Sequence, residues 1–279
     1  MSIKIAIPSY KRPNDVTTIS WIPLEYHENV YLFVRAEEYE AYAAKYSTVN
    51  IVQLSNVNNI GETRQRIVEH LANEKVWMID DDVLLHRSFV DKSKWRGYHT
   101  VRAHKKIPVG NADFYDAIEF IEDQMRLGFV HGSYLPAIFP RNTLNYPTRV
   151  NTWSFSNTFL DLTRIPTDLL VYEKMDQLED MYQWLTLCKA GFDSVTMINF
   201  LTSSSKSNSP GGCSSYRNVT NFNNACNKIL KDFPEYTFRR SSPHSLNIPD
   251  ESKRISIQAK INRYPDKDVI EARKSLTLL

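Results

Sequence analysis

Cysteine, glycine and long apolar runs are all scarce in this sequence of 279 residues. The three cysteines, Cys188, Cys213 and Cys226, are widely spaced and form no CxxC pair. This spacing argues against a disulfide framework and a cysteine zinc site, and it predicts reduced cysteines in a cytoplasmic protein. No stretch approaches the roughly 20 apolar residues that cross a bilayer. Residues 1–10 are too short and polar for a signal peptide, so we expect no membrane association.

An excess of charge of either sign is also missing. The chain has 34 basic and 32 acidic residues and a net charge of +2, which neither requires nor excludes a nucleic-acid partner. Hydrophobic residues make up 42% and charged residues 24%, which is ordinary globular composition and excludes a disordered chain. Only eight glycines occur, so each is expected to meet a specific need of the backbone. Nothing in the sequence indicates an obligate protein partner.

The first third of the chain alternates between apolar strands and helices. Strands are predicted at residues 3–7, 30–34, 50–54 and 76–79, and helices at residues 37–45 and 61–73. Strands separated by helices form parallel sheets with right-handed crossovers, and ligands bind beyond the carboxyl ends of those strands. Three polar segments fall at these ends, residues 8–12, 58–64 and 80–82.

The remainder of the chain is less regular. Helices are predicted at residues 113–127, 176–189 and 218–231, strands at residues 129–139, 152–162 and 194–201, and polar loops at residues 91–106 and 202–217. We therefore predict an α/β fold with a mostly parallel, Rossmann-like sheet, helices on both faces and a mixed second lobe. No linker is evident, so we predict a single domain over residues 1–279, divided into residues 1–83, 84–235 and a C-terminal extension, 236–279.

The strongest chemical signal is the acidic triplet Asp80, Asp81 and Asp82 at the end of an apolar strand. Adjacent carboxylates repel one another and need a compensating cation. Asp80 and Asp82 are two positions apart, a spacing that places both on one face of an extended chain. A hard divalent ion would bind them there and keep positions open for phosphate oxygens. The alternative is a solvated acidic turn.

A second signal is the polar helix start around Asn59, Gly61 and Arg64. Free N–H groups at a helix N-terminus suit a phosphate, and an arginine adds a fork of donors. The alternative is an ordinary helix cap with an arginine that faces solvent.

The pair Glu179 and Asp180 opens a later predicted helix, where a carboxylate suits a general base. Asp176 and Glu179 have the spacing of a capping box, which would explain Glu179 without catalysis but leaves Asp180 unexplained.

Two loops carry residues that suit larger ligands. Residues 91–106 mix cations with aromatic rings, an arrangement that suits nucleic-acid strands, although a solvated charged face would look the same. Residues 209–217 combine two glycines with an arginine and are expected to fold over a ligand, unless they form only a mobile serine-rich loop. The candidates are Lys94, Trp95, Arg96 and Arg102 in the first loop, and Gly211, Gly212 and Arg217 in the second.

Together these motifs resemble glycosyltransferases of the GT-A fold and the family-2 type, in matching order over residues 3–190. The resemblance implies a first loop that holds the nucleobase of a UDP-sugar, an acidic motif that holds Mn²⁺ or Mg²⁺ on the donor diphosphate, and a Glu-Asp pair that supplies the base. It assigns catalysis to Asp180 and Glu179 and the metal to Asp80 and Asp82. The donor residues it implies are Pro8, Ser9, Tyr10, Arg12, Arg35, Asn59, Gly61, Arg64, Asp80 and Asp81.

The helix start Asn59-x-Gly61-x-x-Arg64 and the loop around Gly211 and Gly212 are similar, more narrowly, to phage and TET-associated glycosyltransferases that modify DNA bases. This resemblance implies an inverting, metal-dependent transfer of a sugar, with glucose expected, from a UDP-sugar to a hydroxyl on 5-hydroxymethylcytosine or its glucoside in DNA. Trp153 is assigned to the acceptor side with the two loops. The alternatives are transfer to a polysaccharide or small molecule, and a nucleotide-binding protein without catalysis.

Overall fold

The computed structural model describes residues 2–90, 104–137, 148–153, 156–204, 212, 218–239 and 255–261. One ten-stranded sheet forms its centre, with the strand order β3-β2-β1-β4-β9-β7-β10-β5-β6, and β8 pairs with β10 off this path. Its strands are β1 (Lys4–Pro8), β2 (Val30–Arg35), β3 (Asn50–Leu54), β4 (Lys75–Ile79), β5 (Leu84–Val90), β6 (His104–Pro108), β7 (His131–Pro136), β8 (Thr148–Val150), β9 (Asn157–Asp161) and β10 (Ser194–Ser203).

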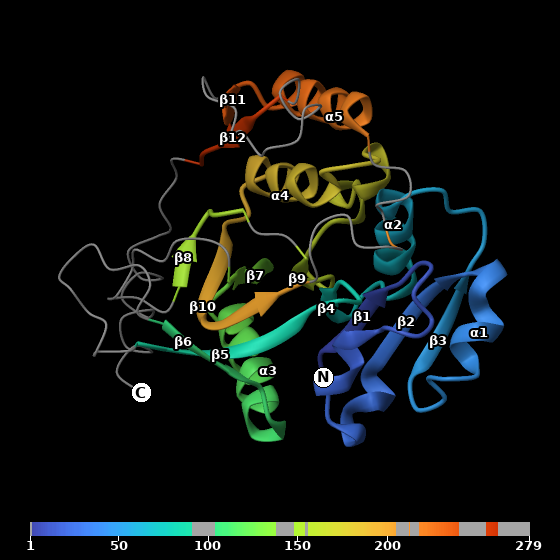
Figure 1. The fold of residues 1–279 in the computed structure, drawn as a ribbon. Coiled ribbons are helices and arrows are strands. Elements are labelled where there is room, and N and C mark those ends of the chain that lie inside the picture. The colour runs from blue at the N-terminus through green and yellow to red at the C-terminus, as the bar shows by residue number, and fades with distance from the viewer. Residues whose placement is uncertain are drawn as a thin grey trace.

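Helices cover both faces of this sheet. The α-helices are α1 (Tyr39–Ala43), α2 (Ile60–His70), α3 (Asn111–Arg126), α4 (Glu179–Lys189) and α5 (Val219–Asp232). Short 3₁₀ helices connect them: η1 (Thr17–Trp21), η2 (Leu24–Asn29), η3 (Ala36–Glu38), η5 (Thr167–Leu169) and η6 (Tyr172–Lys174). Figure 1 shows α2 and α4 above the sheet and α3 below it, with α5 stacked on α4 beside the small hairpin of β11 (Thr237–Arg239) and β12 (Ile257–Ala259).

Strand alternation divides the apolar residues between two main cores. In β1, Ile5 and Ile7 join the core beneath α3 and η1, whereas Ala6 lies in the core beneath α2. This is the period of two that a strand buried on both faces requires. A third cluster joins α4 to α5.

The direction of pairing changes along the sheet. Strands β3, β2, β1 and β4 are parallel, β9 runs antiparallel to both β4 and β7, and β10 is parallel to β7 but antiparallel to β5 and β8. The predicted α/β class, the parallel first portion with helices on both faces, and the mixed second lobe are therefore confirmed. The parallel portion places the ends of β1 and β4 side by side, which is where the site residues lie.

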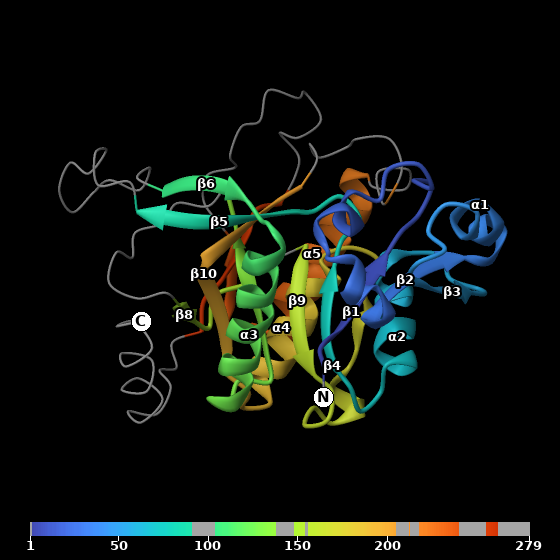
Figure 2. The same ribbon diagram turned by 90° about the horizontal axis from the view of Figure 1, so that it is seen from below.

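Five strands were not expected. Strand β5 follows the acidic triplet at once, and β6 occupies the end of the segment predicted as a loop at residues 91–106 (Figure 2). These two strands pair with each other, with β6 at the edge of the sheet and β5 between β6 and β10. Polar residues are tolerated near an edge, and the hydrophobic alternation of both segments is weak. The three-residue strands β8, β11 and β12 are too short to show a hydrophobic pattern. Among the described residues, no helix is long and apolar enough to cross a membrane.

Candidate active site

The acidic triplet lies directly after β4 and beside the end of β1. Ser9 Oγ donates a hydrogen bond to Asp81 Oδ2 (2.6 Å) and also shares one with the Tyr42 hydroxyl (2.8 Å). The Asp81 side chain is only 7% exposed, so the middle carboxylate of the triplet points into the protein. Asp80 and Asp82 are more exposed, with side chains 33% and 19% exposed, and they lie just beyond the end of β4, where the chain turns.

Two arginines approach the triplet from separate elements. Arg12, in the loop after β1, places Nη1 at 2.8 Å from Asp81 Oδ1 and 3.0 Å from Asp82 Oδ2. Arg64, in α2, places Nη2 at 2.8 Å from Asp80 Oδ1. Each outer carboxylate is thus paired with its own guanidinium, which is the compensation that three adjacent negative charges need. The side chain of Arg64 is only 6% exposed, against 14% for Arg12.

Burial and charge shift the titration of these groups. Burial raises the pKa of Asp81 to about 7, although Ser9 and Arg12 act in the opposite direction. Burial also raises the pKa of Asp80, against the attraction of Arg64. Burial opposes the charge of Arg12, but Asp81 and Asp82 more than offset it and raise the pKa of the guanidinium. The arginines therefore stay charged, while burial and the neighbouring arginines shift the pKa values of Asp80 and Asp81 in opposite directions.

The start of α2 is fixed by capping. Asn59 accepts a hydrogen bond from the Glu62 N–H (2.9 Å), and the Glu62 carboxylate in turn accepts one from the Asn58 N–H (2.8 Å). A Cβ on Gly61 would lie 2.0 Å from the carbonyl oxygen of Met175, which explains why this position holds glycine. The cap interpretation therefore describes Asn59 and Gly61, while Arg64 faces Asp80 and not solvent. Donor binding by Asn59 and Gly61 stays a prediction.

The predicted pair at the start of α4 separates into two environments. Glu179 is buried, with Oε1 at 3.4 Å from Nη1 of Arg64, so the same arginine joins Asp80 to Glu179. Asp180 lines a pocket, and one of its oxygens accepts a hydrogen bond from the Met181 N–H (2.7 Å). Burial raises the pKa of Asp180 to about 7, and the nearby Glu179 charge adds to the shift. A carboxylate with this pKa is suited to accept a proton near neutral pH.

The capping box proposed for α4 is wrong. The residue before the helix is Leu178, which adopts a left-handed conformation (φ 58°) and provides no side-chain cap. Asp176 instead accepts a hydrogen bond from Asn59 Nδ2 (3.1 Å), and so connects the entrance of α4 to the entrance of α2. A leucine in the left-handed region is strained, and such strain is typical of functional sites. The sharp turn sends Glu179 toward Arg64 and Asp180 toward the pocket.

The loop after β1 carries an aromatic ring next to cations. The Arg35 guanidinium lies 3.8 Å from the centre of the Tyr10 ring, and Arg35 Nη2 also donates a hydrogen bond to the carbonyl oxygen of Asn58 (2.9 Å). Tyr10 and Arg35, both predicted donor residues, are therefore in contact, and Pro8 is the last residue of β1 just before them. Stacking between a ring and a guanidinium builds a flat surface that suits a planar ligand.

Gly212, from the predicted glycine loop, lies next to the loop that follows β1. The Gly212 N–H donates a hydrogen bond to the carbonyl oxygen of Tyr10 (2.8 Å), with Gly212 in the left-handed region (φ 58°). A Cβ on Gly212 would lie 3.5 Å from the Arg12 guanidinium. The predicted acceptor residue Trp153 packs against the cluster between α4 and α5. The other loop candidates lie outside the described residues: Lys94, Trp95, Arg96, Arg102, Gly211 and Arg217.

Sequence reasoning missed two residues that shape the site. Tyr42, in α1, bonds both the Ser9 hydroxyl and the Arg12 N–H (3.0 Å). Thr18, in η1, donates through its hydroxyl to the carbonyl oxygen of Asp80 (2.6 Å) and through its N–H to that of Asp81 (3.0 Å). Neither residue stands in a motif, so no local signal in the sequence marks them. In the described part of the chain, no group of three or more histidine, cysteine, aspartate or glutamate residues is arranged to hold a metal.

The class of protein follows from the family comparison. The family model of the TET-associated glycosyltransferases matches residues 3–212, a span that runs from β1 to Gly212 and includes every site residue described above. The chain therefore belongs to the TET-associated glycosyltransferase family, and the prediction of a glycosyltransferase of this type is confirmed.

Two phage relatives are similar over most of the chain. The Beta-glucosyl-HMC-alpha-glucosyl-transferase of Enterobacteria phage T2 is 32% identical over 260 residues, which cover 91% of this chain and 90% of the relative. The protein of the same name from Enterobacteria phage T6 is 34% identical over 236 residues, with 84% and 82% covered.

Among solved structures, a UDP-glucose pyrophosphorylase complexed with UDP-glucose is 10% identical, with a TM-score of 0.39 and coverage of 83% of this chain and all of that one. The A197 protein from STIV is 12% identical, with a TM-score of 0.35 and coverage of 74% and 86%. At these TM-scores the likeness adds nothing to the assignment.

Proposed function

We propose that this protein transfers glucose from UDP-glucose to a hydroxyl on 5-hydroxymethylcytosine or its glucoside in DNA, with inversion at the anomeric carbon. The names of the phage relatives support the transferred group and the modified cytosine, but the alpha-glucosyl transfer that they state is not support for inversion. One observation of the structure carries the proposal: Arg64 joins Asp80, at the end of β4, to Glu179, next to Asp180, so the predicted donor and catalytic groups meet at one sheet edge. An enzyme that modifies phage DNA would act in the cytoplasm of the host.

The donor set fits a divalent cation. Asp80 and Asp82 offer carboxylate oxygens on the more exposed side of the triplet, whereas Asp81 is turned inward. Mg²⁺ and Mn²⁺ prefer oxygen ligands, and Mg²⁺ is held by one or two carboxylates together with substrate phosphates and waters. Asp80 and Asp82 would hold the ion, which when bound would neutralise the leaving diphosphate as a Lewis acid.

The remaining steps belong to side chains of this chain. Asp180 would take the proton of the acceptor hydroxyl while the hydroxyl oxygen forms its bond to the anomeric carbon of the sugar. The bond from that carbon to the diphosphate oxygen breaks, and its electron pair leaves with UDP. A single attack of this kind inverts the anomeric configuration. Arg64 keeps Glu179 ion-paired, so Asp180 is the carboxylate of the pair that lines the pocket.

The acceptor side is proposed to contact DNA. A base inside a duplex reaches a protein pocket only when the DNA bends or the nucleotide is extruded. A sugar already attached to the base projects into the major groove, so transfer to a second sugar avoids this cost. Phosphate contacts would make binding fall steeply with salt. DNA binding by filter retention at 50 and 200 mM salt checks this, and an unchanged affinity would argue against a DNA acceptor.

Mass spectrometry of intact nucleosides tests the function directly. The protein is incubated with UDP-glucose, Mn²⁺ and DNA that carries either 5-hydroxymethylcytosine or its glucoside, and the DNA is then digested. We expect one added hexose, and proton coupling constants of the product will give the anomeric configuration. A product with the α configuration of the donor would refute inversion. If neither DNA gains mass with any UDP-sugar of a panel, the DNA acceptor is wrong and polysaccharide or small-molecule acceptors are tested next.

A further inference from the structure

Arg12 is held in a defined position in the loop that follows β1. Its backbone N–H donates a hydrogen bond to the hydroxyl of Tyr42 (3.0 Å), and its side chain is only 14% exposed. Gly212 lies close to the guanidinium, since a Cβ added there would be 3.5 Å from the Arg12 Cζ and Nη2 atoms. The fold therefore sets the position of this cation.

One nitrogen of this guanidinium bonds two carboxylates of the triplet. Nη1 lies 2.8 Å from Asp81 Oδ1 and 3.0 Å from Asp82 Oδ2. The side chain of Asp81 is 7% exposed and also accepts a hydrogen bond from Ser9, whereas the side chain of Asp82 is 19% exposed. Charge-assisted hydrogen bonds are stronger where water is excluded. A ligand therefore competes more easily for the bond to Asp82 than for the bond to Asp81.

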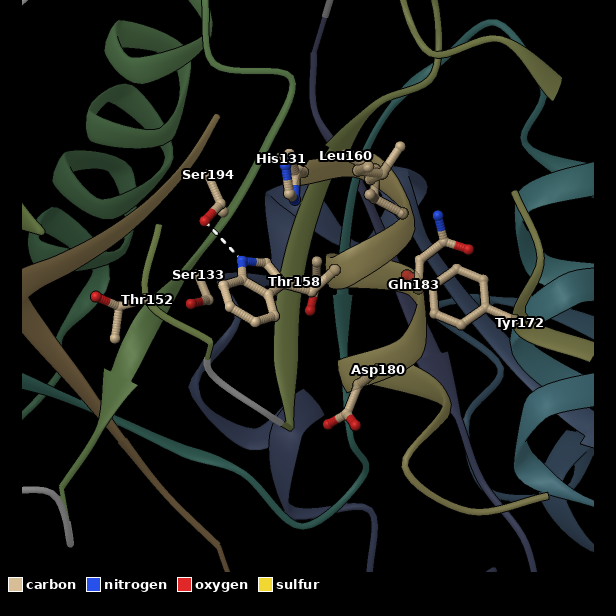
Figure 3. A pocket seen from close by; sticks show the side chains of 12 residues that line it. His131, Ser133, Thr152, Thr158, Leu160, Tyr172, Asp180, Gln183 and Ser194 are labelled. Atoms are coloured by element: carbon tan, nitrogen blue, oxygen red, sulfur yellow. Dashed lines mark hydrogen bonds between the residues drawn. The ribbon is translucent and has the colours of Figure 1, made fainter. Parts of the chain in front are cut away.

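The other outer carboxylate of the triplet is paired with a different kind of arginine. Arg64 is 6% exposed and pairs with both Asp80 (2.8 Å) and Glu179 (3.4 Å). Figure 3 shows the residue after Glu179, Asp180, at a pocket whose lining includes two hydroxyl side chains, Ser133 and Thr158. Arg64 therefore belongs to both ends of the site, whereas the ion pairs of Arg12 described above lie within the triplet.

A divalent ion at the triplet meets the positive charge of Arg12. Such ions are held by one or two carboxylates together with substrate phosphates, and here each outer carboxylate is already paired with an arginine. An ion that arrives alone must displace Nη1 from Asp82 and lie beside a guanidinium of the same sign. A diphosphate that arrives with the ion supplies phosphate oxygens and negative charge, which offset this repulsion.

We propose that Arg12 is a positioning residue that occupies Asp82 until the donor binds, so that the divalent ion and the diphosphate enter the site together. Arg12 then yields Asp82 to the ion and keeps its more buried bond to Asp81, so its positive charge stays at the triplet. Metal binding thereby depends on the donor. This inference rests on the proposed function, because it needs a divalent ion and a donor diphosphate.

Metal binding can be measured without catalysis by titrating the full chain with Mn²⁺ and following free Mn²⁺ by electron paramagnetic resonance. In the wild type, Mn²⁺ alone should bind at least about tenfold more weakly than Mn²⁺ with saturating UDP, within the usual range of coupling between two ligands. Arg12→Gln removes the competing charge, so Mn²⁺ alone should bind about tenfold more tightly than in the wild type, the lower end for a hydrogen bond between charged groups. UDP binding at saturating Mn²⁺ should weaken by about two- to tenfold, because a cation is lost from the triplet. A variant that is only damaged cannot shift the two affinities in opposite directions.

Two further arginine substitutions serve as controls. Arg66→Gln changes an arginine of α2 whose side chain is 52% exposed, and Arg12→Lys keeps the positive charge, so both should keep the Mn²⁺ affinity of the wild type. Asp82→Asn added to Arg12→Gln should remove the gain in Mn²⁺ affinity, and thermal melting confirms that each variant folds. If Arg12→Gln binds Mn²⁺ alone no more tightly than Arg66→Gln, the proposal is overturned. Equal Mn²⁺ affinity with and without UDP in the wild type would overturn it without any variant.

The nucleoside assay separates this inference from the proposed function. Tighter Mn²⁺ binding by Arg12→Gln, in a protein whose wild type adds no hexose to DNA, would support the role of Arg12 and refute the proposed function. Added hexose with the wild type, together with an unchanged Mn²⁺ affinity in Arg12→Gln, would do the reverse.

Discussion

The two portions of the sheet, formed by residues 1–83 and residues 84–235, differ in how the polar side chains near the site are hydrogen-bonded. In the first, the polar groups are already bonded to one another: Ser9 and Arg12 both bond Asp81, and Arg12 also bonds Asp82. In the second, the hydroxyls of Ser133 and Thr158 have no partner among the described residues. The charged groups of the first portion therefore form a preformed network, whereas these two hydroxyls of the second portion belong to no network of described residues.

This difference predicts which step, donor binding or transfer to the acceptor, a substitution in each portion will affect. A network of charge-assisted bonds holds its geometry before the ligand arrives, which suits a charged nucleotide. A general base acts on an acceptor only when the acceptor hydroxyl reaches it, so the residues around Asp180 are expected to influence acceptor choice. We expect substitutions in residues 1–83 to alter donor binding, and substitutions in residues 84–235 to alter turnover and acceptor choice.

The sharpest test of this division is Asp180→Asn. The amide cannot take a proton, so turnover should fall by roughly 10²–10⁴-fold, the usual contribution of a general base. UDP binding should stay close to that of the wild type, because Asp180 makes no bond to the triplet. Steady-state kinetics and calorimetry with UDP measure the two effects. The exposed Asp168→Asn is the matched control, and wild-type turnover in Asp180→Asn would show that the base is elsewhere.

The converse test is Asp82→Asn. Loss of one charged oxygen ligand should weaken UDP binding in the presence of Mn²⁺ by at least about 10–100-fold, the loss seen when even an outer partner of a metal is removed. Binding of UDP without metal should change far less. Calorimetry with and without Mn²⁺ separates the two, with Glu37→Gln as an exposed control in the same portion of the chain. Equal binding with and without metal in the wild type would dismiss the metal site.

A pH profile sharpens the comparison further. With the pKa of Asp180 at about 7, turnover should rise as pH increases through 7, and at pH 6 it should be roughly tenfold below its plateau. The sign for stability is opposite. The folded state holds this proton up to about pH 7 and the unfolded state loses it near the ordinary value of 3.8, so the free energy of unfolding falls with rising pH between them. Asp180→Asn should flatten the slope of turnover and reduce the slope of stability, leaving in stability the parts due to Asp80 and Asp81, whose pKa values are also raised by burial. A turnover profile that is flat from pH 6 to 8 would contradict this assignment.

The smallest effect is expected at Gly61, where α2 of the first portion packs against η6 of the second. Gly61→Ala would place a Cβ 2.0 Å from the Met175 carbonyl oxygen and 2.5 Å from that of Tyr172, so α2 and η6 must move apart. Overpacking of this kind costs about 1–3 kcal/mol, which lowers Tm by roughly 2–10 °C. Because Arg64 moves with α2, donor affinity and turnover should decline together. Gly110→Ala, where the nearest atom is 4.0 Å from the added Cβ, should leave Tm almost unchanged, and equal melting of both variants would rule out the close approach.

Most of the fold in residues 1–83 was predictable because its signals are local. Apolar strands, a helix that starts at a glycine and an acidic strand end each appear within a few consecutive residues, and parallel topology then brings the ends together. The same reasoning marked Asp180, at a helix start, as a candidate general base, and this role stays a prediction. Strand β5, which lies between β10 and the edge strand β6, escaped prediction because its polar residues hide the period of a strand.

The partners of the site residues were not predictable, because they come from distant segments. Tyr42 meets Ser9 across 33 residues, and Asn59 meets Asp176 across 117. The left-handed turn at Leu178 has no signal either, since leucine rarely adopts it. The local sequence pattern predicts which chemical groups are present. Tertiary packing decides that Glu179 is ion-paired with Arg64 while Asp180 lines the pocket.

The ion pair between Arg64 and Glu179 also has a consequence for folding during synthesis, because its two partners are made at different times. Glu179 is synthesised 115 residues after Arg64, so at ~5–20 residues per second the arginine waits roughly 6–23 s for this partner. Throughout that interval the face of α2 around Gly61 lacks the backbone of residues 172–175 that will cover it. The nascent N-terminal segment therefore passes through a period of exposure to chaperones and proteases, which ends when α4 emerges from the ribosome.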